Sequence, residues 1–235
     1  MQTLVLLPGL MCDAHVWTPL YPWLPQHIKP WVADYGMAQN LQVMAHQVLA
    51  QAPPSFALAG HSMGGRVALE VVRMAPQRVT HLALLDTGYL ARPGGDAGER
   101  EASKRYELLE LARHQGVRAM AQTWVQGMVH PARLQDTALV NAVLDMFDLK
   151  TADIFACQIK ALLDRPDASD VLRALRIPTL LQCGAQDSWA SPAQHAEMHL
   201  LVPHAQMDVI AEAGHMAPME QAQAVAASLL RCLQR

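Results

Sequence analysis

A serine between two glycines, in the GHSMG segment at residues 60–64, has the residue types and spacing of a nucleophile elbow. An apolar run at residues 56–59 precedes it and predicts a strand, while residues 65–72 predict a helix. Glycines two positions either side of Ser62 let the two backbones come close where the chain reverses. Such a turn would expose the Ser62 hydroxyl and place the backbone N–H of Met63 at a helix N-terminus, where a developing oxyanion is stabilised.

A serine hydroxyl is a weak nucleophile, so it needs an imidazole that accepts its proton and a carboxylate that orients the imidazole. His215 and Asp187 each follow a predicted strand in the last quarter of the chain. Asp86 closes an earlier predicted strand and is a second candidate for the carboxylate. All three would lie at carboxyl ends of strands, which meet at one edge of a parallel sheet. We therefore predict a catalytic Ser-His-Asp triad at that edge, and we interpret His61, beside the serine, as structural.

Short apolar runs that alternate with helical patterns define the elements that would position these residues. Strands are predicted at residues 3–7, 28–33, 55–59, 79–85, 178–183 and 206–211. Apolar stripes at residues 41–52 and 222–233 have helical spacing. Strands joined by crossover helices indicate an α/β fold with a mostly parallel sheet of about six strands, flanked by helices on both faces.

The alternation stops for about ninety residues after Leu85, where the pattern becomes helical. We predict a flexible exit at residues 92–98 and helices at residues 101–114, 117–129, 136–148 and 152–163. A helical block inserted at this point would cover the edge to which the elbow points. We therefore expect a core domain of residues 1–88 and 176–235 and a helical cap insertion of residues 89–175.

The composition favours a small-molecule substrate. The 235 residues are 51% hydrophobic and include 18 basic and 21 acidic residues without a dense run of either sign, which predicts no nucleic-acid or membrane partner.

Four scattered cysteines lack metal-site spacing and indicate reduced thiols, so we expect a cytoplasmic protein without a metal or an organic cofactor. The N-terminal apolar run ends at Pro8, too early for a signal peptide. We expect a monomer or a small homo-oligomer.

The chain order Ser62, Asp187, His215 resembles that of the α/β-hydrolase superfamily, in particular its small, cap-bearing carboxylesterase-like branch. Four segments carry the resemblance: LLPGL at residues 6–10, GHSMGG at residues 60–65, GAQD at residues 184–187 and AGH at residues 213–215. The family pattern favours Asp187 over Asp86 as the triad acid. By resemblance, the backbone N–H groups of Leu10 and Met63 form the oxyanion hole, although this chain has proline where many relatives have histidine before Gly9.

Apolar residues beside the predicted catalytic and oxyanion residues, or in the expected cap, are candidates for the substrate pocket. They are Met11, Trp189 and Met216 in the core and Trp124, Met128 and Phe147 in the cap. For the cap residues, simple core packing is an equally good interpretation. The resemblance implies a serine hydrolase that cleaves small to medium carboxylic esters through an acyl-enzyme. Thioesterase, lactonase, carbon–carbon hydrolase and lyase activities use the same triad and stay open, and a non-catalytic ligand-binding protein is the least favoured alternative.

Overall fold

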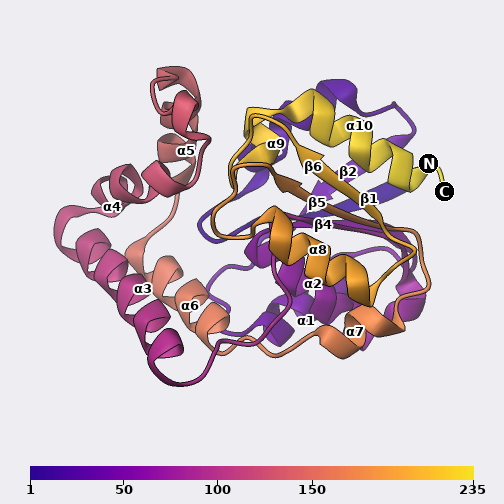
Figure 1. Cartoon of the computed structure of the whole chain (residues 1–235), viewed down its shortest axis with the longest axis horizontal. Helices are drawn as coiled ribbons and strands as arrows, with labels where there is room; N and C mark the ends of the chain where they lie inside the picture. The colour runs from indigo at the N-terminus through magenta and orange to yellow at the C-terminus, as the bar shows by residue number, and fades with distance from the viewer.

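The computed structural model describes residues 1–235, and its centre is one parallel sheet of six strands (Figure 1). In sheet order these are β2 (Ile28–Val32), β1 (Gln2–Leu7), β3 (Phe56–His61), β4 (Val79–Leu85), β5 (Thr179–Gly184) and β6 (Gln206–Ile210). Every neighbouring pair is parallel. The fold class predicted from the sequence is therefore confirmed.

The strand order reverses between β1 and β3. The chain leaves β1 toward β2 at the sheet edge, crosses back to β3, and then continues outward through β4, β5 and β6. Crossovers that leave neighbouring strands in opposite directions open a crevice at their carboxyl ends, where open α/β sheets bind ligands. The loop after β1 and the elbow after β3 therefore meet at the position in the sheet best suited to a site.

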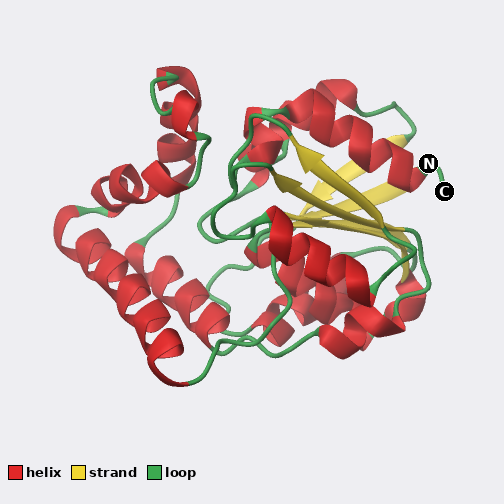
Figure 2. Ribbon diagram, viewed as in Figure 1, coloured by secondary structure: helices red, strands yellow, loops and turns green.

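Helices cover both faces of the sheet (Figures 1 and 2). One face is covered by α1 (Leu41–Gln51), α2 (Met63–Met74), α7 (Ser169–Ala174) and α8 (Pro192–Leu201), with a 3-10 turn η3 (Pro76–Arg78). The other face is covered by α9 (Ala217–Glu220), α10 (Ala222–Leu233) and the 3-10 segments η1 (Ala14–Val16) and η2 (Thr18–Trp23). Every residue of the central strands β3 and β5 is buried, as expected for strands covered on both faces.

The segment between β4 and β5 contains helices and no strand. It comprises α3 (Gly95–Gln115), α4 (Val117–Trp124), η4 (Val125–Gly127), η5 (Pro131–Arg133), α5 (Thr137–Asp148) and α6 (Ala152–Leu163), before α7. Helices α3 to α6 lie beside the body that contains the sheet (Figure 1). None of the helices combines the length and the apolar character that crossing a membrane requires.

The flexible exit predicted at residues 92–98 is wrong in its second half, because α3 already begins at Gly95. Asp96 lies in the first turn of that helix, where a negative charge interacts favourably with the helix dipole. A Cβ atom at Gly98 would lie 1.9 Å from the carbonyl oxygen of Pro93, so only glycine permits this approach. Glycines that suggest a loop in the sequence instead allow a tight entry into the helix.

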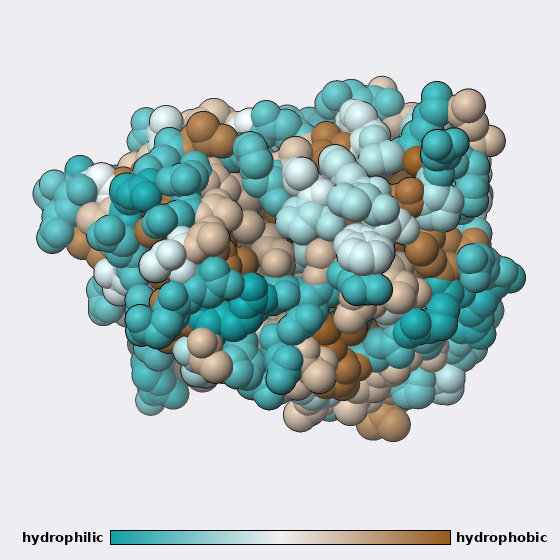
Figure 3. Space-filling view, turned by 90° about the horizontal axis from the view of Figure 1, so that it is seen from above, coloured by the Kyte–Doolittle hydropathy of each residue, from teal (hydrophilic) through white to brown (hydrophobic).

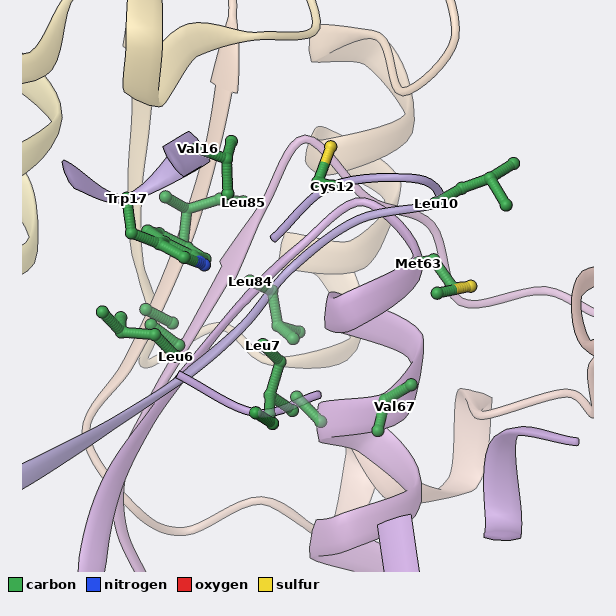
Figure 4. Close-up of a cluster of buried hydrophobic side chains, with 14 of the residues drawn as sticks. Leu6, Leu7, Leu10, Cys12, Val16, Trp17, Met63, Val67, Leu84 and Leu85 are labelled. Carbon is green, nitrogen blue, oxygen red and sulfur yellow. The ribbon is translucent and has the colours of Figure 1, made fainter. Parts of the chain in front are cut away.

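Buried apolar side chains pack on both faces of the sheet near the carboxyl ends of its strands (Figure 4). Leu7 of β1 and Leu84 of β4 are buried on the face that α2 covers with Val67, whereas Leu6 is buried on the other face beside Trp17. All four cysteines are buried and unpaired. Hydrophilic side chains cover most of the face seen in Figure 3, and apolar side chains form only small patches there. The core thus gives the loops at the strand ends a rigid support.

Candidate active site

Ser62 occupies the turn between β3 and α2 in a strained backbone conformation. Its φ is 54° and its ψ is −118°, a region that residues with a side chain rarely adopt. A Cβ atom at Gly60 would lie 2.3 Å from the carbonyl oxygen of Gly64, and one at Gly64 would lie 2.0 Å from the carbonyl oxygen of Leu7. The glycines of the motif are therefore needed for close approach of backbones, as the sequence predicted.

Replacing Gly64 by alanine should lower the free energy of unfolding by about 3 kcal/mol, because the new methyl group would overlap a backbone carbonyl that cannot move independently of β1. Urea unfolding measures the loss. Gly94→Ala is the matched control, since Gly94 has a negative φ and no atom within 4 Å of an added Cβ. Equal stability of the two variants would contradict the close approach.

Ser62, His215 and Asp187 form one hydrogen-bonded series. His215 Nε2 lies 2.8 Å from Ser62 Oγ, and His215 Nδ1 lies 2.8 Å from Asp187 Oδ2. The carboxylate can only accept, so Nδ1–H donates to it, and Nε2 keeps the lone pair that can accept a proton from the serine. The His215 side chain is 7% exposed and that of Asp187 is fully buried, so the pair is shielded from water.

The loop that carries His215 is fixed by the segment that follows η4. The backbone N–H groups of His215 and Met216 both donate to the carbonyl oxygen of Met128, at 2.6 Å and 3.2 Å. Buried Glu220 accepts from Gly214 N–H at 2.8 Å and from His130 N–H at 2.7 Å. The helical segment therefore helps to hold the imidazole in place.

The surroundings of Asp187 favour its ionised form. Burial by itself would raise its pKa, but the charge of His215, its hydrogen bond, and the N–H groups of Ala190 and Trp189 outweigh burial and lower the pKa. Asp86, the other candidate, makes no hydrogen bond with His215; its Oδ1 accepts from Gly184 N–H at 2.8 Å. Burial, followed by the charge of Asp187, raises the pKa of Asp86 well above its usual range. The surroundings thus shift the pKa values of the two carboxyl groups in opposite directions.

The loop after β1 brings Leu10 to the elbow. A Cβ atom at Gly9 would lie 3.1 Å from Ser62 Cβ, so the loop touches the serine directly. As the first residue of α2, Met63 has a backbone N–H without an acceptor inside its helix. Figure 4 shows Leu10 and Met63 at the same end of the strands. Leu10 and Met63 both line the cavity that contains Ser62, so the predicted oxyanion hole is compatible with the structure.

Proline before Gly9 leaves this loop well supported. Tyr35 donates its hydroxyl proton to the carbonyl oxygen of Pro8 at 3.2 Å. The buried side chain of Gln158, from α6, accepts from the N–H of Met11 at 2.8 Å. The φ of Met11 is 63°, another strained conformation beside the serine. Sequence reasoning missed both supporting side chains, because neither is near the loop in the chain.

A cavity of about 510 Å³ opens above Ser62. Leu10, Met63, Trp124, Met128 and Trp189 line it, together with His215. The Trp189 ring lies 4.9 Å from the His215 ring and stacks on Trp124 at 5.6 Å. An aromatic wall therefore runs from the imidazole toward α4.

Three residues predicted to line the pocket do not reach the cavity. Met11, Phe147 and Met216 are fully buried in the core. Phe147 packs behind the wall, with its ring 5.6 Å from that of Trp124. Met11 and Met216 adjoin functional positions in the chain, but neighbouring residues in a turn point in different directions. Proximity in sequence was therefore a poor guide to contact with the cavity.

A family model described as "Alpha/beta hydrolase family" matches residues 4–228, almost the whole chain. The chain belongs to the alpha/beta hydrolase family. The resemblance noted in the sequence is confirmed. In this alpha/beta hydrolase, no group of three or more His, Cys, Asp or Glu side chains is arranged to hold a metal ion.

Several known proteins are similar to this alpha/beta hydrolase. It is 28% identical over 185 residues to the sn-1-specific diacylglycerol lipase ABHD11 of Mus musculus, a match that covers 77% of this chain and 58% of that protein. It is 26% identical to the pimeloyl-(acyl-carrier protein) methyl ester esterase of Aliivibrio salmonicida, over 90% of this chain and 84% of that protein. A thermophilic esterase from Thermogutta terrifontis has the same fold, with a TM-score of 0.84 and 24% identity over 100% of this chain and 90% of that one.

The cavity of this alpha/beta hydrolase also has a charged side that sequence reasoning missed. Five ionisable residues from α2, α3 and the end of the helical segment line it: Arg66, Glu101, Lys104, Arg105 and Arg165. From the sequence, only apolar residues of the expected cap were candidates for the pocket, because the apolar residues of α4 dominate the pattern there. No local signal could have shown that basic residues so far apart in the chain share one cavity.

His61, interpreted as structural from the sequence, supports the His215 loop of this alpha/beta hydrolase. Its Nε2–H donates to the carbonyl oxygen of His215 at 2.8 Å, while its buried Nδ1 has no partner. Burial, followed by the charge of His215, lowers the pKa of His61 to about 3. His61 is therefore held neutral throughout the ordinary pH range.

Acid should destabilise the protein through His61. An unfolded histidine binds a proton near pH 6.5, whereas the folded protein keeps His61 neutral down to about pH 3. In between, the unfolded state binds more protons, so the free energy of unfolding falls as the pH falls. His61→Gln keeps a donor for the carbonyl oxygen of His215 and removes the titration. Between pH 7 and pH 5 the wild type should lose about 2 kcal/mol more than His61→Gln in urea unfolding; equal losses would contradict a neutral His61.

Proposed function

We propose that this chain is a serine hydrolase that cleaves small to medium carboxylic esters through an acyl-enzyme. The observation that carries the proposal is the hydrogen-bonded series Ser62–His215–Asp187 at the floor of the cavity. Two similar proteins have names that describe ester cleavage: the diacylglycerol lipase of Mus musculus and the methyl ester esterase of Aliivibrio salmonicida. Their names favour a carboxylic ester over the other bonds that such a triad can cleave.

In the proposed mechanism, His215 accepts the proton of Ser62 as Oγ attacks the ester carbonyl carbon. Asp187 stabilises the imidazolium that forms, and the N–H groups of Leu10 and Met63 stabilise the oxyanion of the tetrahedral intermediate. His215 then gives its proton to the leaving alcohol, which departs and leaves Ser62 acylated. Water then attacks the acyl-enzyme and gives a proton to His215. His215 returns this proton to Ser62 Oγ as the bond between Oγ and the acyl carbon breaks and the acid product leaves. Each step conserves the protons and needs no cofactor.

The proposed role of residues 89–175 is that of a cap over the reacting bond. Trp124 and Met128 line the cavity that also contains Ser62, and hydrogen bonds to the carbonyl oxygen of Met128 fix the His215 loop. An ester bound beneath these side chains would be shielded from bulk water, which strengthens electrostatic stabilisation of the transition state. The cavity volume of about 510 Å³ suits a small-molecule substrate.

A panel of p-nitrophenyl acyl esters of increasing chain length tests the proposal. We expect hydrolysis that saturates with substrate, is fastest for short to medium acyl chains, and disappears in Ser62→Ala. Matched thioesters and lactones in the same assay compare the other reaction classes. Equal, slow hydrolysis of every ester by wild type and Ser62→Ala would contradict the proposal and would favour a ligand-binding protein.

A further inference from the structure

One side of the cavity carries more positive than negative charge. Four basic side chains line it, Arg66, Lys104, Arg105 and Arg165, against the carboxyl groups of Glu101 and Asp86. Burial and the neighbouring Asp187 raise the pKa of Asp86 well above its usual range, which disfavours its charged form. The basic side chains on this side of the cavity outnumber the two acidic ones, and only Glu101 among the acids pairs with them.

Glu101 is fully occupied by two of the arginines. Arg165 donates to its two carboxylate oxygens at 2.6 Å and 2.8 Å, in the bidentate geometry that suits a guanidinium. Arg105, one turn further along α3, donates twice to Glu101 Oε1, at 3.1 Å and 3.0 Å. One carboxylate thus pairs with two guanidinium groups, so these three side chains together keep a net positive charge.

Arg66 has no acidic partner. Its Nη1 donates to the carbonyl oxygen of Leu90 at 2.8 Å, and Arg165 Nε donates to the same oxygen at 3.3 Å. Two guanidinium groups therefore lie side by side on one carbonyl oxygen. Burial, followed by the charge of Arg165, lowers the pKa of Arg66 to about 9, which still leaves it charged at neutral pH. Arg66 is only half-buried, and its charge has no counterion among the neighbouring side chains. An anionic group that binds there would supply this counterion.

The basic side chains line the same cavity as Ser62. Glu101, Lys104, Arg105 and Leu108 have the spacing of one helical face, and all four line the cavity. Arg66 lies four residues after Ser62 at the start of α2, which is about 6 Å along a helix axis. A ligand that fills the cavity can therefore reach both the serine and the basic side.

We propose that the preferred ester substrates carry a second, negatively charged group, a carboxylate, which binds Arg66 with the support of Lys104 and Arg105 while the ester lies at Ser62. The inference rests on the proposed function, since it names the substrate class of the same site. A carboxylate would supply the counterion that Arg66 lacks and would match the planar fork of its guanidinium. The aromatic wall of Trp124 and Trp189 would then contact the carbon chain between the two ends.

Matched esters that differ only in charge test the inference. Monomethyl glutarate and monomethyl adipate carry the carboxylate, and the corresponding methyl esters with a terminal carboxamide have the same shape without the charge. We expect kcat/KM of the wild type to favour the carboxylate member of each pair by about tenfold or more. Arg66→Gln and Arg105→Gln should reduce that ratio toward one. Arg113→Gln, on the same helix but paired with Glu110 outside the cavity, should leave the ratio unchanged.

Binding to Ser62→Ala gives a second readout that does not depend on turnover. Calorimetry should show tighter binding of monomethyl adipate than of its carboxamide match, and adding Lys104→Glu should abolish the difference. Lys104 is exposed, so this charge reversal is compatible with folding even where Arg66→Gln is not. Ser62-dependent hydrolysis without any preference for the carboxylate would overturn the inference and leave the proposed function intact. Preferential binding of the carboxylate without hydrolysis by the wild type would support the anion site and overturn the proposed function.

Discussion

Replacement of Ser62 by alanine should lower kcat for ester hydrolysis by roughly 10⁴- to 10⁶-fold. Without the hydroxyl no acyl-enzyme can form, and any remaining turnover would come from water attacking an ester bound near the oxyanion donors. The structure gives the loss a local cause, because Ser62 Oγ is the atom that lies 2.8 Å from the base. The measurement is kcat with p-nitrophenyl esters, with thermal melting to show that the variant is folded.

Ser103→Ala is the matched control for this experiment. Ser103 is exposed on α3 and lies outside the cavity lining, so its removal should leave kcat unchanged. A fluorophosphonate, which phosphonylates activated serines, should label the wild type and Ser103→Ala but not Ser62→Ala. Labelling of Ser62→Ala at another serine, together with retained turnover, would place the nucleophile elsewhere.

Asp187→Asn should lower kcat by about 10⁴-fold, the second largest effect that we expect. The Asp187 Oδ1 atom already accepts N–H groups from Trp189 and Ala190, so an asparagine would keep its oxygen there and turn its amide N–H toward His215. His215 would then carry its proton on Nε2, which faces Ser62 and could no longer accept the serine proton. The substitution changes the tautomer while conserving the shape of the side chain.

Asp86→Asn provides the comparison, with an expected loss of less than about tenfold. Burial raises the pKa of Asp86, so the neutral form of its carboxyl group is favoured. An asparagine has the shape of that neutral form, and its amide oxygen can accept the same N–H of Gly184. The measurement is kcat for both variants at several pH values. A large loss at Asp86 beside a small loss at Asp187 would reverse the assignment of the acid.

Local patterns in the sequence were sufficient for the strands and for the elbow. The predicted strands agree with β1 to β6 to within two residues at each end, since short apolar runs and the turn residues that bound them are local signals. The helix start at Gly95 was harder to predict from the sequence. Gly98 is needed there because its lack of a side chain lets the carbonyl oxygen of Pro93 come close, and a glycine in the sequence does not reveal such a contact. Glycine spacing alone does not distinguish a flexible loop from a close approach.

Some residues of the candidate site were predictable from the sequence, and others were not. Ser62, Asp187 and His215 follow β3, β5 and β6 respectively, and a parallel sheet brings the carboxyl ends of its strands to one edge. Their meeting was therefore implied by their places in the chain. Gln158 and Glu220, which support the oxyanion loop and the His215 loop, had no such signal.

The fold class, the family and the three residues of the hydrogen-bonded series were predictable from the sequence, because each depends on short motifs and on their order along the chain. The side chains that line the cavity depend on packing between distant segments, which gives the cavity one aromatic and one basic side. Arg66 and Arg165 are 99 residues apart in the sequence, yet both donate a hydrogen bond to the carbonyl oxygen of Leu90. Such long-range neighbours are set by how helices pack, and no local pattern encodes that packing.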